Sequence, residues 1–179
     1  MNTLKEKYQK EIRPSFQKEL GLASVEAVPK LVKITVNTSS KDFKTDKDFL
    51  AKTKVWLATI TGQTPLATKS KTSIAAFNLR EGEVVGLKVT LRGDRAYDFF
   101  QKLTTIVLPR LKDFQGVSRN TFDQKGTYSL GFSEQIVFPE IEYDKIGRIQ
   151  GLEVIISTSA KDAKTSMRLL ESLGMPFTK

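Results

Sequence analysis

Three carboxylates near the end of the chain are the residues best suited to chemistry. Glu140, Glu142 and Asp144 alternate within the run PEIEYDK. In an extended segment, side chains two positions apart share a face, so three carboxylates could hold Mg²⁺ for phosphoryl chemistry. The same spacing also suits an acidic edge that faces solvent or a partner. Gly82 and Gly86 in GEVVG match neither a dinucleotide-binding nor a Walker pattern, so no phosphate loop supports the enzyme hypothesis.

The chain contains no cysteine and no histidine. Disulfides and thiolate metal sites are therefore excluded, and the usual general base is missing. We expect a protein that is not an enzyme and that carries no metal and no cofactor. A Mg²⁺-dependent RNA-processing enzyme that uses the acidic cluster is the alternative.

A basic stretch is the second candidate for a functional site. Residues 62–80 include Lys69, Lys71 and Arg80 but no acidic residue. The whole chain has 29 basic and 20 acidic residues, a net charge of +9 and a pI near 9.7. Such a surplus attracts polyanions such as nucleic acid or an anionic membrane. RNA binding uses more of the chain than catalysis does, although a soluble protein that is merely basic has the same composition.

Length and composition indicate an ordinary folded protein. With 179 residues, of which 39% are hydrophobic and 27% charged, the chain suits a single domain over residues 1–179. No apolar run approaches the ~18 residues of a membrane span, and the charged N-terminus lacks the apolar core of a signal peptide. We therefore expect a cytoplasmic protein with no membrane association.

Two segments alternate as strands that are buried on one face only, KLVKITVN and VVGLKVTLR. The residues expected in the core are Val32, Ile34, Val36, Val85, Leu87, Val89 and Leu91. The residues expected on the opposite face are Lys33, Thr35, Asn37, Lys88, Thr90 and Arg92. This polar face suits RNA docking, and a solvated sheet face is the alternative.

The other elements follow from periodicity and capping signals. Helices are expected over residues 2–20, interrupted at Pro14; from a Thr45–Asp48 capping box to Gly62; from an Asp94 cap to Pro109; and through Ala163, Met167, Leu170 and Leu173 to Gly174. Extended segments are expected at Pro65–Ser70, Ser73–Leu79, Thr127–Phe132 and Leu152–Ser157. Residues 110–150 hold many aromatic residues and are expected to form a long ordered interaction segment. The fold class is thus α+β, an antiparallel or mixed sheet with helices packed on one face and a polar RNA-docking face on the other.

Four collinear runs carry a resemblance to a known family: ITGQTPLATKSKTSIAAFNLREG, GLKVTLRGD, LPRLKDFQGVS and GTYSLGFSEQIVFPEIEYDKI. Together they resemble the fifth protein of the large ribosomal subunit, the family that binds 5S ribosomal RNA, in its bacterial form. The likeness extends from PKLVKITVN to the closing GMPF. It implies a structural protein that attaches 5S rRNA in the central protuberance, contacts peptidyl-site tRNA and bridges to the thirteenth protein of the small subunit. It also implies contacts with other large-subunit rRNA and proteins, and no obligate homo-oligomer.

The resemblance, taken with the polar strand faces, assigns residues to these contacts. Binding of rRNA is assigned to Lys33, Thr35, Asn37, Gln63, Thr64, Lys88, Thr90 and Arg92. The tRNA-contacting loop is assigned Lys69, Ser70, Lys71, Thr72, Ser73, Asn78 and Arg80. The small-subunit bridge is assigned Glu140, Glu142, Asp144, Lys145 and Arg148.

The sequence departs from the family pattern in two places. Where the family often has glycines after the strand asparagine, this chain reads NTSSKDF. Ala76 stands where glycine is usual, and Asn78 stands where lysine is usual. The first change predicts that the loop after Asn37 approaches RNA less closely. The changes at Ala76 and Asn78 predict a loop tip that is stiffer and less positively charged, and so a weaker contact with tRNA.

Overall fold

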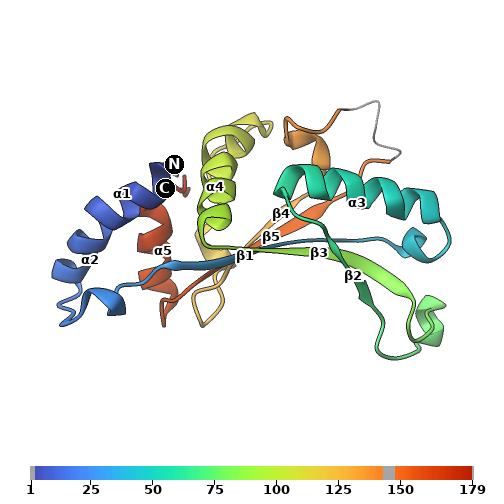
Figure 1. Ribbon diagram of the computed structural model, residues 1–179, viewed down its shortest axis with the longest axis horizontal. Coiled ribbons are helices and arrows are strands. Elements are labelled where there is room, and N and C mark those ends of the chain that lie inside the picture. The colour runs from blue at the N-terminus through green and yellow to red at the C-terminus, as the bar shows by residue number, and fades with distance from the viewer. Residues whose placement is uncertain (1–2, 143–147, 179) are drawn as a thin grey trace. The chain divides into compact units, whose positions relative to one another are not determined.

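The computed structural model describes residues 3–142 and 148–178 (Figure 1). The fold is α+β, and its five strands form one antiparallel sheet in the order β2-β3-β1-β5-β4, which confirms the predicted class. The strands are β1 (Leu31–Ser39), β2 (Leu66–Lys69), β3 (Val84–Arg92), β4 (Tyr128–Phe132) and β5 (Leu152–Thr158). The described α-helices are α1 (Thr3–Lys7), α2 (Arg13–Glu19), α3 (Lys47–Thr61), α4 (Asp94–Lys102) and α5 (Ala163–Ser172).

Shorter helical turns connect these elements. Two are π-helical, η1 (Tyr8–Ile12) and η5 (Leu103–Val107). The 3₁₀ turns are η2 (Val25–Ala27), η3 (Lys41–Lys44), η4 (Ala75–Phe77), η6 (Leu108–Arg110), η7 (Arg119–Thr121) and η8 (Gln135–Val137). No helix among the described residues has the length and apolar content needed to cross a membrane.

The chain divides into two compact units. Unit 1 comprises Met1–Ile34, Leu91–Leu130 and Ile155–Lys179, and unit 2 comprises Thr35–Thr90 and Gly131–Val154. The single domain over residues 1–179 stays a prediction, which calorimetry tests by showing whether the two units unfold together.

In unit 1, the first predicted helix forms with a π-helical turn at its middle. Tyr8, Ile12 and Phe16, which are spaced four residues apart on one face of a helix, are buried. The N–H of Arg13, the residue before Pro14, donates to the carbonyl of Tyr8, five residues earlier. A proline ring clashes with the preceding helical turn, and widening that turn lets the helical course continue.

Helix α4 shows the predicted stripe but not the predicted cap. The stripe at helical spacing along α4 and η5 is buried, namely Ala96, Phe99, Phe100, Leu103 and Val107, whereas Ile106 of η5 lies off it and is 44% exposed. The prediction of Asp94 as N-cap is wrong, because Gly93, with a φ of 59°, takes that position. The carboxylate of Asp94 instead pairs with Lys5.

The stripe of helix α5 is rotated from the predicted one. Leu170 and Leu173 are buried as expected, but Ala163 and Met167 are only half-buried. Ser166 is fully buried, and its hydroxyl donates to the carbonyl of Gly126 at 2.6 Å, which offsets the cost of burying a polar group. A polar residue can thus occupy the core face, which periodicity of apolar residues does not reveal.

Aromatic packing orders the first part of the 110–150 segment within unit 1. The ring of Tyr128 lies 4.5 Å from that of Phe122 and 5.6 Å from that of Phe177. The hydroxyl of Tyr128 donates to the carbonyl of Ser118 at 2.7 Å. The short strand expected at Thr127–Phe132 is confirmed as β4.

In unit 2, helix α3 runs alongside the strands (Figure 1) and buries Phe49, Trp56, Leu57 and Ile60. It ends at Gly62 as predicted, in the left-handed conformation with a φ of 63°. The Thr45–Asp48 capping box is wrong: Asp46 caps the helix and accepts the N–H of Phe49 at 2.8 Å. The Thr45 hydroxyl donates to the Asp42 carbonyl instead.

Burial along β1 and β3 departs from the prediction at two positions. Val32 is 40% exposed, whereas its neighbour Leu31 is buried. The backbone of Leu31 forms a hydrogen bond with the hydroxyl of Tyr97, and burial raises the pKa of that hydroxyl to about 12. Val85 is half-buried and is the extra residue of β3 at a register shift, since Thr68 of β2 pairs with Gly86 and Lys69 pairs with Val84. Ile34, Val36, Leu87, Val89 and Leu91 are buried as predicted.

Candidate nucleic-acid interface

The strands of unit 2 carry a polar face opposite their buried one. On β1, Thr35 and Asn37 are half-buried and flank Val36, which is completely buried. On β3, Lys88 is exposed and Thr90 is half-buried, and between them Val89 is buried. The alternation predicted from the sequence therefore places these four polar side chains on the faces opposite the core residues.

The register of β2 on β3 adds residues that the sequence prediction missed. Leu66 pairs with Lys88, and Thr68 pairs with Gly86. Paired residues share a face of the sheet, so Leu66 and Thr68 lie on the same side of the sheet as Lys88. Leu66 is 64% exposed, which is unusual for a leucine and suits contact with a base or sugar.

Asn37 is held in a fixed orientation by a residue far away in the sequence. Its amide Nδ2 donates to Oε2 of Glu153 at 3.0 Å, and the neighbouring hydroxyl of Thr38 donates to the carbonyl of Gly151 at 2.7 Å. These contacts leave the Asn37 amide oxygen as an acceptor at a defined place. Nothing in the local sequence signals the contact with Glu153.

The other four residues predicted to bind rRNA lie outside the strand segments of unit 2 that carry the polar face. Gln63 is half-buried and Thr64 is exposed, and both follow the Gly62 helix end in unit 2. Lys33 is half-buried and Arg92 is exposed, and both belong to the parts of β1 and β3 that fall in unit 1.

The predicted tRNA loop between β2 and β3 is braced by its own hydrogen bonds. The N–H of Ser70 donates to the Glu83 carbonyl at 2.9 Å, and the N–H of Gly82 donates back to the Ser70 carbonyl at 3.0 Å. The Glu83 carboxylate accepts the N–H of Arg80 at 2.9 Å. Of the predicted contact residues, those exposed to solvent are Lys69, Lys71, Thr72, Ser73, Asn78 and Arg80.

The loop tip is a turn and not the extended segment predicted at Ser73–Leu79. Turn η4 is closed by a pair of backbone bonds between Ile74 and Leu79, of 2.9 and 3.1 Å. Asn78 has a φ of 49°, a left-handed conformation that asparagine tolerates better than most residues. Lys44 of η3 donates to the carbonyls of Asn78 at 2.6 Å and Phe77 at 3.3 Å. The sequence prediction missed Lys44 as the residue that holds the tip.

Turn η3 also contacts Arg148, a residue predicted for the small-subunit bridge. Nη1 of Arg148 lies 2.7 Å from Oδ2 of Asp42 in this turn, and the Arg148 guanidinium lies 5.4 Å from the ring centre of Phe49. Glu140 and Glu142 are exposed. Asp144 and Lys145 lie outside the described residues.

The sequence predicted that Glu140, Glu142 and Asp144 share one side of an extended segment, and this is wrong at Glu140. Glu140 lies in a turn closed by the N–H of Ile141 on the carbonyl of Phe138 at 3.1 Å, so period-two alternation does not hold there. Within residues 3–142 and 148–178, no group of three carboxylates is arranged to bind a metal ion.

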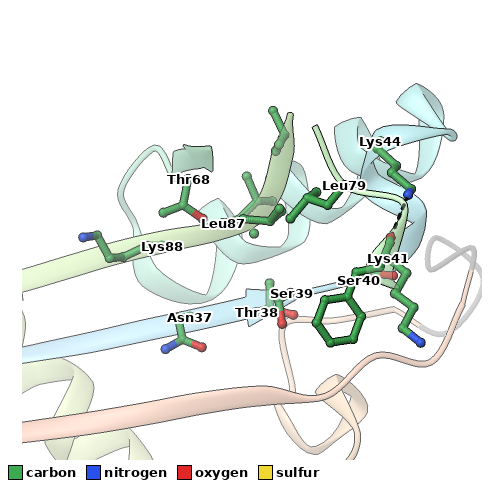
Figure 2. Close-up of a pocket in the computed structure, with 14 residues that line it drawn as sticks. Asn37, Thr38, Ser39, Ser40, Lys41, Lys44, Thr68, Leu79, Leu87 and Lys88 are labelled. Atoms are coloured by element: carbon green, nitrogen blue, oxygen red, sulfur yellow. Dashed lines mark hydrogen bonds between the residues drawn. The ribbon is translucent and has the colours of Figure 1, made fainter. Parts of the chain in front are cut away.

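A pocket of about 520 Å³ lies beside the polar face in unit 2 (Figure 2). Its wall is formed by the end of β1, turn η3, β2, the loop tip and the start of β3. The lining residues are Asn37, Thr38, Ser39, Ser40, Lys41, Lys44, Thr68, Phe77, Leu79, Val84, Val85, Gly86, Leu87 and Lys88.

These features define a basic α+β protein with a polar, lysine-bearing sheet face. Comparison with family models identifies the family. The model of the ribosomal L5 family C-terminus matches residues 84–177, and the model described as Ribosomal protein L5 matches residues 24–80. The chain belongs to the ribosomal L5 family. It is thus an RNA-binding structural protein of the large ribosomal subunit, in a family that is not enzymatic, and its partners are rRNA and other ribosomal proteins.

Proposed function

We propose that this chain binds 5S rRNA through the polar strand face and helps to attach it in the central protuberance. The observation that carries the proposal is the alternation of Lys88 and Thr90 with a fully buried core on β3, matched by Thr35 and Asn37 on β1. Lysine neutralises phosphates, whereas threonine and asparagine hydrogen-bond 2′-hydroxyls and base edges. The face therefore combines charge with groups that recognise RNA.

Two single substitutions separate these roles. Lys88→Ala removes a phosphate contact, so affinity for 5S rRNA and for an unrelated RNA falls alike and the salt slope decreases by about 1. Thr90→Ala leaves the slope unchanged and reduces the preference for 5S rRNA. Lys52→Ala, an exposed lysine on α3, is the matched control. Filter binding at several salt concentrations reads all three, and equal behaviour of Lys88→Ala and Lys52→Ala contradicts the proposed face.

We also propose that the loop from Lys69 to Arg80 contacts peptidyl-site tRNA. Its exposed basic residues, Lys69, Lys71 and Arg80, suit a phosphate backbone. The backbone bonds at Ser70 and the anchor at Lys44 present these residues from an ordered scaffold. Ordering before contact lowers the entropy that binding must overcome.

A third contact is proposed with the thirteenth protein of the small subunit. Glu140 and Glu142 are exposed, and an acidic edge is complementary to a basic partner protein. Glu142→Gln is expected to slow association with that partner and to weaken its salt dependence, whereas Glu134→Gln, also exposed, is the matched control. Surface plasmon resonance measures both, and identical association rates contradict the bridge.

A further inference from the structure

The pocket shares lining residues with the contacts proposed above: Asn37, Thr68 and Lys88 with the polar face, and Phe77 and Leu79 with the loop from Lys69 to Arg80. Its interior has no part in those contacts. Its volume of about 520 Å³ falls within the roughly 300–1,000 Å³ of sites that hold small organic groups. Asn37 and Lys88 lie toward one end of it, and Lys41 and Lys44 toward the other (Figure 2). Because Asn37 and Lys88 also belong to the polar face, RNA bound there passes the entrance.

One part of the wall is apolar. It consists of Phe77, Leu79, Val84, Val85 and Leu87. Phe77 is 66% exposed, although its backbone is fixed by Lys44. An ordered, exposed aromatic ring at the wall of a pocket offers a flat surface for stacking.

The other part of the wall is polar and cationic. Lys41, Lys44 and Lys88 line it, and none of the lining residues carries a carboxylate. The two groups that Lys44 bonds are neutral carbonyls, so they do not cancel its charge. Among the described residues, no group hydrogen-bonds the hydroxyls of Ser39 or Thr68. These hydroxyls supply donors and acceptors between the apolar and the cationic parts.

A flat ring that carries hydrogen-bonding edges and a phosphate matches all three parts of this wall. That combination is a nucleotide, with its base against Phe77, its base edge at the hydroxyls and its phosphate at the lysines. A base stacked within a duplex cannot enter, so the nucleotide must be unpaired. We propose that this pocket takes one unpaired nucleotide of the RNA bound on the polar strand face. This inference rests on the proposed function, because that function supplies the RNA.

The first test uses the full chain, labelled with ¹⁵N, and adenosine 5′-monophosphate as the probe. Amide signals of Ser39, Lys41 and Phe77 should shift saturably with the nucleotide and far less with ribose 5-phosphate at equal concentration. Phe77→Leu keeps an apolar side chain but removes the ring, and should weaken nucleotide binding by about tenfold. Ile74→Ala, an exposed residue of the same loop outside the pocket wall, is the matched control.

The second test measures 5S rRNA affinity of the same variants. The proposal requires that Phe77→Leu weakens 5S rRNA binding while Ile74→Ala does not. Equal shifts with ribose 5-phosphate overturn it, because the pocket would then bind only phosphate. Nucleotide binding with unchanged 5S rRNA affinity in Phe77→Leu overturns the RNA-borne occupant. If the wild-type chain binds the nucleotide but shows no preference for 5S rRNA, the proposed function fails together with the RNA-borne occupant.

Discussion

A buried glutamine, Gln135, bonds the backbone of Arg148 and Gln150 within unit 2. Gln135 is completely buried; its Nε2 donates to the carbonyl of Arg148 at 2.7 Å, and its Oε1 accepts the N–H of Gln150. Gln150 in turn accepts a bond from the Thr53 hydroxyl at 3.3 Å and donates to the carbonyl of Ser39 at 3.4 Å. One side chain thus satisfies two backbone groups, the part-buried carbonyl of Arg148 and the buried N–H of Gln150.

Replacing this glutamine should cost much more than its contact area suggests. Gln135→Leu leaves the Arg148 carbonyl and the Gln150 N–H without partners, so the free energy of unfolding should fall by about 2–4 kcal/mol. Gln124→Leu, at an exposed turn position, should change it by less than about 0.5 kcal/mol. Urea denaturation compares the two variants, and equal stabilities would contradict the role assigned to the network.

Among the elements, the four-residue turn η3 contacts two other segments of unit 2, the loop tip and Arg148. Lys44 bonds the tip of the loop between β2 and β3, and Asp42 pairs with Arg148, a residue predicted for the small-subunit bridge. The turn is itself short and follows β1 directly. Two segments proposed to contact different partners are therefore anchored to one turn after β1.

Loss of the Lys44 anchor should loosen the loop tip without removing its charged contact residues. Lys44→Met removes two hydrogen bonds from a charged donor, so the amides of Ile74 and Leu79 should exchange with solvent about fivefold faster. Lys41→Met, which removes a neighbouring lysine of the same turn, should leave these rates unchanged. Hydrogen exchange by NMR reads both residues directly. If these amides exchange at the same rate in the wild-type chain and in Lys44→Met, Lys44 does not order the tip.

Local pattern predicted those parts of the fold that depend on neighbours in the chain. The alternation of β3 and the period of α4 and η5 identified Leu87, Val89, Phe99 and Leu103 as core, because one buried face suffices to produce each pattern. Caps were less predictable. Both Asp46 and Thr45 are good N-caps by type, and only the backbone course decides between them.

Contacts between residues far apart in the chain could not be predicted from the sequence. Asn37 meets Glu153 across 116 positions, and Lys44 meets Asn78 across 34. Neither pair leaves a periodic or spacing signal, because each depends on which strands become neighbours. The candidate site was therefore predicted as a set of residue types on two strands, while the contacts that fix Asn37, the loop tip and the pocket came from the structure.

At the scale of the whole molecule, the net charge of +9 alone would bind any RNA. Such binding releases counterions and weakens steeply as salt increases, whatever the sequence or shape of the RNA. The proposed function demands more, because oriented groups such as Asn37 and Thr90 must favour one RNA over another. Preference at increasing salt separates these two contributions.

The most direct test is a titration of the purified chain with 5S rRNA and with an unrelated structured RNA of equal length, at several salt concentrations. We expect affinity for both RNAs to fall with salt while 5S rRNA keeps a preference of about tenfold or more, equivalent to about 1.4 kcal/mol. Equal affinities that decline together would contradict 5S rRNA recognition by the polar strand face and would leave it a generic phosphate-binding surface.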